Sequence, residues 1–180
     1  MKPTPEILAY FPGKQAEITS YAHLLASTAI ERGLVGPKEA DRIWERHIAN
    51  CIPITTTIPQ AVRVVDIGSG AGLPGIVIAL ARPDLKVTLV EPLQRRVDFL
   101  LEVVDQLKLP IQVVRGRAEA VKMQFEIITC RAVAPLEKLI QISWHMIPKV
   151  AACWRSKVRV PRRRLIKPSL KRGQPPNCIR

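Results

Sequence analysis

The sequence predicts an α/β fold built on a parallel sheet, and two observations carry this prediction. Short β-branched segments alternate with segments of helical periodicity between residues 62 and 130, and such alternation is typical of a parallel sheet covered on both faces. A glycine-rich turn, Gly68–Gly75, separates the first strand from the helix that follows it. A chain of 180 residues with 47% hydrophobic residues is long enough for one core and short for two.

The segment before the sheet predicts helices. Apolar residues recur at helical spacing over 21–29 and again over 43–51, on either side of a break at Gly36–Pro37. A threonine-rich connector bracketed by prolines follows at 53–59. We therefore expect residues 1–60 to form an N-terminal helical extension.

The elements of the core follow in order over residues 61–148. Val62–Ile67 predicts a buried strand because it is β-branched and lies between Pro59 and Gly68. The same alternation predicts the rest: a helix over 73–81, a strand over 86–91, a helix over 95–108, strands near 111–114 and 125–130, and a helix that begins at Pro135.

The composition changes sharply after residue 148. Residues 1–148 contain 17 basic and 15 acidic residues, whereas residues 149–180 contain 11 basic residues and no acidic ones. Almost all of the formal net charge of +13 therefore belongs to this segment. A Pro- and Arg-rich sequence without periodicity predicts a disordered basic tail over 149–180.

Several classes of protein do not fit the sequence. The longest apolar run, Ile76–Ala81, is far shorter than the ~18 residues of a membrane span, and the N-terminus does not resemble a secretory signal. The four cysteines are widely scattered, without the close pairs of metal or redox sites. We expect a cytoplasmic protein with reduced thiols, no bound metal and no membrane partner.

The glycine-rich turn predicts a cofactor site. Glycines between a strand and a helix let the backbone approach a ligand closely, and the helix N-terminus presents free N–H groups. Glu91 ends the next strand, at the spacing where a carboxylate commonly accepts hydrogen bonds from a cofactor ribose. Both features fit NAD as well as S-adenosylmethionine. Taken alone, the turn could be purely structural and Glu91 a solvated strand-end carboxylate.

Five ordered motifs and an N-terminal string narrow the choice, and together they span about residues 21–148. Read along the chain, they are Trp44-Glu45-Arg46-His47-Ile48-Ala49-Asn50-Cys51, Gly68-Ser69-Gly70-Ala71-Gly72-Leu73-Pro74-Gly75, Ala81-Arg82-Pro83-Asp84-Leu85, Glu91-Pro92, Gly116-Arg117-Ala118-Glu119 and Arg131-Ala132-Val133-Ala134-Pro135-Leu136. The chain resembles, in an actinobacterial style, the bacterial ribosomal RNA guanine-N7 methyltransferases, also known as glucose-inhibited division protein B.

The resemblance implies a Rossmann-like class I methyltransferase fold over residues 61–148 with an N-terminal helical extension, and S-adenosylmethionine as cofactor. It implies methyl transfer to N7 of a guanine in 16S ribosomal RNA, by a monomer that acts on this RNA or on the small ribosomal subunit. The cofactor-binding residues that it implies are Gly68, Ser69, Gly70, Leu73, Glu91, Ala118, Glu119 and Arg131. Arg131 could face the RNA instead, or form an ordinary surface ion pair.

RNA contact is predicted for a second set of residues, for which ordinary structural roles stay open. Arg46 and His47 match the family and could touch RNA or cap the N-terminal helices, and a hydrogen-bonded structural role is the better fit for His47. Arg95, Arg96 and Lys138 are candidates for contact with the RNA backbone or are solvated charges. No catalytic base is named, because guanine N7 has an in-plane lone pair and no proton to lose, so positioning dominates.

The sequence departs from the family after Lys149. Relatives continue with a glycine turn and an apolar strand, whereas this chain reads Val150-Ala151-Ala152-Cys153-Trp154-Arg155. Permitted codons for this stretch, read in another frame, give the expected Gly-Gly-Gly-Val-Leu-Ala-Ile-Lys-Gly. We hypothesise a single-nucleotide frameshift, which gene sequencing tests: codons that cannot give that string would refute it.

Three other functions remain open at this stage. A methyltransferase with another acceptor has the same cofactor motifs, and a non-catalytic RNA-binding derivative could use the basic tail for affinity. Loss of Glu91 would abolish cofactor binding but would spare salt-sensitive RNA binding by such a derivative. A dinucleotide-dependent dehydrogenase is the least supported, because the sequence supplies no residues for hydride transfer.

Overall fold

The computed structural model describes residues 3–148 and contains one parallel sheet. The predicted tail at 149–180, and the frameshift hypothesis attached to it, lie outside the described residues. The strands are β1 (Arg63–Ile67), β2 (Lys86–Glu91), β3 (Gln112–Arg115) and β4 (Ile127–Cys130). They lie in the order β3-β2-β1-β4, and each neighbouring pair is parallel. The predicted α/β class is therefore confirmed.

The helices of the core agree with the predicted alternation to within a few residues. The longer ones are α5 (Gly75–Ala81), α6 (Gln94–Gln106) and α7 (Leu136–Ser143), and two short 3-10 turns are η4 (Ala118–Ala120) and η5 (Trp144–Met146). Helix α5 begins at Gly75 rather than at Leu73, because the glycine turn continues through Gly72, whose φ is +95°.

Residues 5–55 form a succession of short helices. They are α1 (Pro5–Leu8), α2 (Gln15–Ala26), α3 (Thr28–Glu31), the 3-10 helices η1 (Pro37–Arg42) and η3 (Ala49–Cys51), the π-helix η2 (Ile43–Ile48), and α4 (Ile52–Thr55). The helix predicted over 43–51 is thus not a regular α-helix. Side chains satisfy carbonyls in this wider turn: Asn50 Nδ2 donates to the carbonyl of Arg46, and Cys51 Sγ to that of His47.

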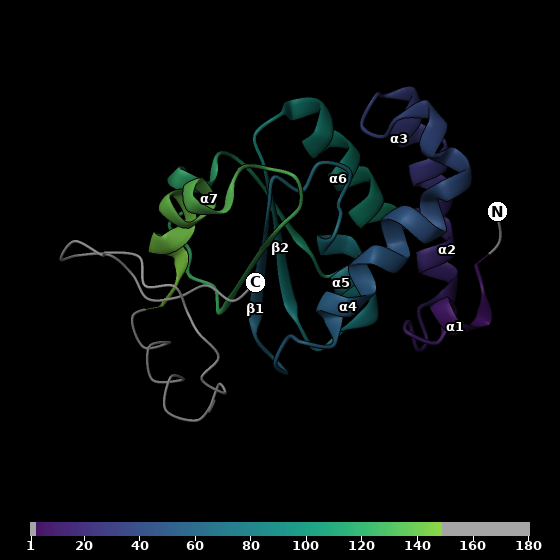
Figure 1. The fold of residues 1–180 in the computed structure, drawn as a ribbon, viewed down its shortest axis with the longest axis horizontal. Coiled ribbons are helices and arrows are strands. Elements are labelled where there is room, and N and C mark those ends of the chain that lie inside the picture. Colours follow the sequence, from purple (N-terminus) through teal and green to yellow (C-terminus); the bar gives the residue numbers. More distant parts are fainter. Residues whose placement is uncertain (1–2, 149–180) are drawn as a thin grey trace, which may run out of the picture. The chain divides into compact units, whose positions relative to one another are not determined.

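The two faces of the sheet carry separate apolar clusters. Successive strand residues point to opposite faces, so Val64 belongs to one cluster and Val65 to the other. The first face, which we call the α5 face, packs against α5 and α6, and α2 packs in turn against α5 in the same cluster. The second, the α7 face, packs against η4, η5 and the segment before β4. Figure 1 shows α7 and α5 on opposite sides of β1 and β2.

Candidate functional site

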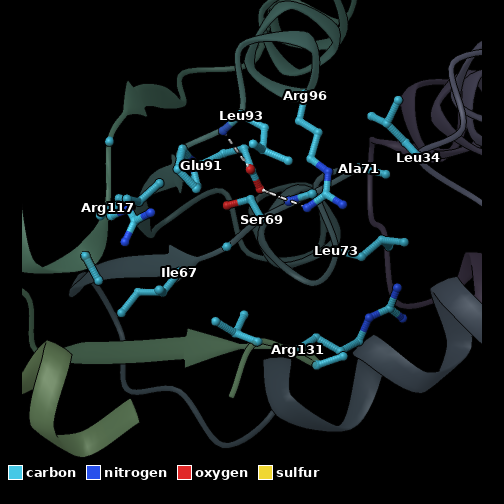
Figure 2. Close-up of a pocket in the computed structure, with 18 of the residues that line it drawn as sticks. Leu34, Ile67, Ser69, Ala71, Leu73, Glu91, Leu93, Arg96, Arg117 and Arg131 are labelled. Atoms are coloured by element: carbon cyan, nitrogen blue, oxygen red, sulfur yellow. Dashed lines mark hydrogen bonds and ion pairs between the residues drawn. The ribbon is translucent and has the colours of Figure 1, made fainter. Parts of the chain in front are cut away.

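A cavity of about 650 Å³ opens at the carboxyl ends of the strands. Its walls come from the ends of β1 and β2, the turns after β3 and β4, and the N-terminal helical region (Figure 2). The strand order changes direction between β1 and β4, and ligands of open α/β sheets bind at the carboxyl ends beside such a switch point. The volume lies within the range of small-molecule sites.

The glycine turn after β1 forms the floor of this cavity. Gly68 has φ +66°, and a Cβ atom added there would lie 2.6 Å from Cγ2 of Val133. Any side chain at Gly68 would therefore be strained and would collide with the opposite wall. Gly70 also has a positive φ, but a Cβ there would meet only the carbonyl oxygen of Gly68, at 3.8 Å. The turn thus presents bare backbone to the cavity.

Two buried side chains form hydrogen bonds with the backbone of the glycine turn. Tyr21 of α2 is fully buried, and its hydroxyl donates to the carbonyl of Ala71 at 2.7 Å. Asp66 Oδ2 accepts the N–H of Gly75 at 3.0 Å, whereas Asp66 Oδ1 is buried without a partner among the described residues. Burial raises the pKa of the Asp66 carboxyl to about 7.

Glu91 joins the glycine turn to the end of β2. Its side chain is buried, Oε2 accepts the N–H of Gly70 at 2.9 Å, and Oε1 accepts the N–H of Leu93 at 3.0 Å. Figure 2 shows the carboxylate between these two backbone segments, in the wall of the cavity. Each carboxylate oxygen has two acceptor sites, so both retain capacity for a ligand hydroxyl.

Arg96 lies beside this carboxylate rather than on an outer surface. Its Nη1 is 3.7 Å from Glu91 Oε2, and its Nε is buried without a partner among the described residues. The side chain lines the cavity and comes from the first turn of α6. The prediction that Arg96 contacts the RNA backbone stays untested, but its position is in the same cavity as Glu91.

A series of polar contacts holds the part of the cavity wall that follows β4. Arg131 Nη2 lies 3.2 Å from His47 Nδ1, and His47 Nε2 lies 3.0 Å from Glu39 Oε2. Arg46 Nη1 donates to the other Glu39 oxygen at 3.0 Å. Burial, which outweighs the opposing effect of Glu39, lowers the pKa of His47. Arg131 is thus in contact with an imidazole, and among residues 3–148 it does not form the ordinary surface ion pair that the sequence left open.

All the predicted cofactor-binding residues line this one cavity, although their roles remain predictions. They are Gly68, Ser69, Gly70, Leu73, Glu91, Ala118, Glu119 and Arg131. Among the predicted RNA-binding residues, His47 and Arg96 also line it, whereas Arg46 and Arg95 do not.

The sequence did not indicate part of the cavity wall. Residues Leu34–Gly36 line it from the N-terminal region, where the sequence signalled only a helix break. Val133 faces Gly68 from the turn after β4, and Arg117 lies beside Ala118. Val133 and Arg117 belong to two of the sequence motifs, so the motifs could have indicated them. No local pattern indicates that Leu34–Gly36 reach the cavity.

Comparison with known proteins identifies a family. The model of the GidB family, described as rRNA small subunit methyltransferase G, matches residues 14–157. A protein named Ribosomal RNA small subunit methyltransferase G from Mycobacterium sp. (strain KMS) is 50% identical over 149 residues, covering 80% of this chain and 65% of that protein. The protein of the same name from Thermobifida fusca (strain YX) is 56% identical over 123 residues, covering 67% of this chain and 52% of that protein.

The match leaves part of each relative uncovered: this chain spans less than two thirds of the length of these curated proteins. Among solved structures, a SAM-dependent methyltransferase from Thiobacillus denitrificans in complex with S-adenosyl-L-homocysteine is 15% identical, with a TM-score of 0.47. That match covers 56% of this chain and 43% of the other.

Proposed function

This chain belongs to the GidB family, rRNA small subunit methyltransferase G, and on that premise we propose that it transfers a methyl group from S-adenosylmethionine to N7 of a guanine in 16S ribosomal RNA. The guanine that we propose is the one at position 527, as the resemblance to the family implies. The observation that supports the proposal best is that eight residues from four separate motifs line one cavity of suitable volume. No helix of the described residues is long and apolar enough for a membrane span.

The residues of the cavity fit the cofactor. Gly68 packs directly against Val133, so a side chain at Gly68 would collide with Val133 and would displace the bare backbone of the turn from the cavity wall. Glu91 would accept hydrogen bonds from the ribose hydroxyls while it continues to hold Gly70 and Leu93. The buried Ala118 and the exposed Glu119 would contact the adenine, and Gly68 and Leu73 the methionine part.

The proposed reaction requires the chain to position the two reactants, and it requires no proton transfer before the methyl group is attacked. The cofactor supplies an electrophilic methyl group on a sulfonium. Guanine N7 carries a free lone pair, so the attacking atom needs no general base. The glycine turn and the Arg131 wall would fix the two reactants in line and exclude water from the reacting atoms, and such positioning alone can lower a barrier by several kcal/mol.

Calorimetric titration with S-adenosylmethionine tests the cofactor. The wild-type chain is expected to bind saturably, whereas Gly68→Asp is expected to lose binding because it adds a side chain and a negative charge to the turn. Leu101→Asp, which adds the same charge at an exposed position on α6 outside the cavity, is the matched control and should bind like wild type. No binding by the wild-type chain would refute the proposal.

A second assay tests the acceptor atom. The wild-type chain should transfer a labelled methyl group to an RNA fragment that carries the target guanine, and should fail on the same fragment with 7-deazaguanine, in which a carbon replaces N7. Equal transfer to both fragments would contradict N7 as the acceptor while leaving the cofactor assignment intact.

A further inference from the structure

His47 joins two parts of the chain that are far apart in sequence. It lies in the π-helix η2, and its ring contacts Arg131, 84 residues later, at the end of β4. The other ring nitrogen contacts Glu39 of η1. The side chain is 15% exposed and lines the cavity together with Arg131. The contact therefore fixes the position of a cavity residue from a distant segment.

The chemistry of the partners determines where the imidazole proton lies. A guanidinium has only donors, so Arg131 must donate its Nη2–H to an unprotonated Nδ1. Glu39 carries a carboxylate that accepts, and Nε2 must therefore hold the proton and donate it to Oε2. Both contacts are satisfied at once only by the neutral ring in its Nε2–H tautomer.

We propose that His47 is a positioning residue that acts through Arg131: Glu39 selects the Nε2–H tautomer, and the free Nδ1 holds the Arg131 guanidinium in the wall of the cofactor cavity. The expected effect on S-adenosylmethionine affinity rests on the proposed function, whereas the assignment of the His47 tautomer does not. It gives the family-matched histidine a role in the cofactor site instead of direct contact with RNA.

The backbone on both sides supports such a role. Ala132, which follows Arg131, has φ +55°, a conformation that costs a residue with a Cβ free energy and persists where the surroundings enforce it. On the other side, Cys51 Sγ donates to the carbonyl of His47 and anchors the wide turn of η2. The bond between His47 and Arg131 thus links two irregular backbone segments at the cavity.

The charges around the His47 ring predict that the contact between His47 and Arg131 depends on pH. The groups that act on His47 are Glu39, Arg131 and Arg46, from η1, the turn after β4 and its own helix. Protonation of Nδ1 removes the acceptor for Arg131 and sets two positive charges side by side. Glu39 then retains its contacts with His47 and Arg46, and Arg131 is released.

Nitrogen-15 NMR of the histidine rings tests the tautomer without any cofactor. The chain has three histidines, and loss of one ring signal in His47→Asn assigns His47. At pH 8 we expect a neutral ring protonated at Nε2, with an unprotonated Nδ1. A ring protonated at Nδ1, or at both nitrogens, at this pH would overturn the proposal.

Two amide substitutions separate positioning from a merely structural role. Asn places its amide oxygen near the Nδ1 position and can accept a hydrogen bond from Arg131. Gln places its amide nitrogen near the Nε2 position and can donate a hydrogen bond only to Glu39. We expect His47→Asn to bind S-adenosylmethionine within about twofold of wild type, and His47→Gln about fivefold more weakly, the scale of one lost hydrogen bond of ordinary strength. In the Arg131→Ala background the two variants should bind equally.

The pH profile supplies a second discriminating readout. Wild-type affinity should fall as pH decreases through the pKa of His47, whereas the affinity of His47→Asn should not follow this profile. Equal losses in His47→Asn and His47→Gln, or a difference that persists without Arg131, would refute the positioning role. Absence of binding by wild type would instead refute the proposed function, and the NMR experiment would still decide the tautomer.

Discussion

The α5 face and the α7 face of the sheet differ in how deeply they are covered. Among the described residues, thirty buried side chains belong to the cluster of the α5 face and seven to that of the α7 face. The first includes Phe11, Tyr21, Trp44 and Phe99 together with apolar residues of five α-helices, whereas Phe125 is the aromatic side chain of the second. Among the described residues, the α5 face therefore supplies most of the buried apolar core.

The difference shows how the cavity is built. The glycine turn is anchored to the α5 face, through Tyr21 of α2 and through Gly75 at the start of α5. The opposite wall, Arg131–Val133, precedes α7 and is held by the polar contact with His47. The glycine turn is thus held by hydrogen bonds from buried groups, and the opposite wall by a hydrogen bond near the surface.

The largest expected effect compares matched aromatic truncations on the two faces. Phe99 (1% exposed) and Phe125 (3% exposed) are both buried. Phe99→Ala should lower the free energy of unfolding by about 4 kcal/mol, and Phe125→Ala by about 2–3 kcal/mol. The loss at Phe125 is smaller because the void left by the missing ring lies under fewer buried side chains, which can relax into it more easily. Urea unfolding measures both. A loss for Phe125→Ala equal to or above that for Phe99→Ala would contradict the asymmetry.

The sequence predicted the α5 face better than it predicted the links across the cavity. Strands such as Lys86–Glu91 and the cofactor motifs carry local signals, namely β-branched runs and a glycine turn, so their positions were predicted to within a few residues. The contact between His47 and Arg131 spans 84 residues, and no local pattern encodes it. The same holds for Arg82, which binds the carbonyls of Thr55 and Ile58 in the connector before β1.

A second prediction concerns the charge buried on the α5 face. The pKa of Asp66 is about 7 in the folded chain against 3.8 for the ordinary carboxyl, so the folded state binds the proton more tightly. Stability from this group is present below about pH 4 and is lost as pH rises through 7, by roughly 4 kcal/mol. Asp66→Asn, which retains an acceptor for Gly75, should remove this slope.

The measurement is the free energy of unfolding of both proteins by urea at several pH values from 4 to 8. The difference between the two curves isolates Asp66 from carboxyls with a lowered pKa, such as Glu126, whose stabilisation is lost as pH falls toward 2. Parallel curves for wild type and Asp66→Asn would show that the buried carboxyl does not titrate in this range.

The smallest expected effect tests whether the α5 face holds the glycine turn through Tyr21. Tyr21→Phe removes the hydroxyl and leaves the buried carbonyl of Ala71 without that donor, which should cost about 1–2 kcal/mol in unfolding free energy. Because this bond fixes the cavity floor, S-adenosylmethionine should also bind about threefold more weakly. Tyr10→Phe, at an exposed tyrosine, should change stability by less than about 0.5 kcal/mol and leave affinity unchanged. If Tyr21→Phe lost stability but kept full affinity, the turn would hold its shape without α2, and the remaining anchors, Asp66 and Glu91, would account for the floor of the site.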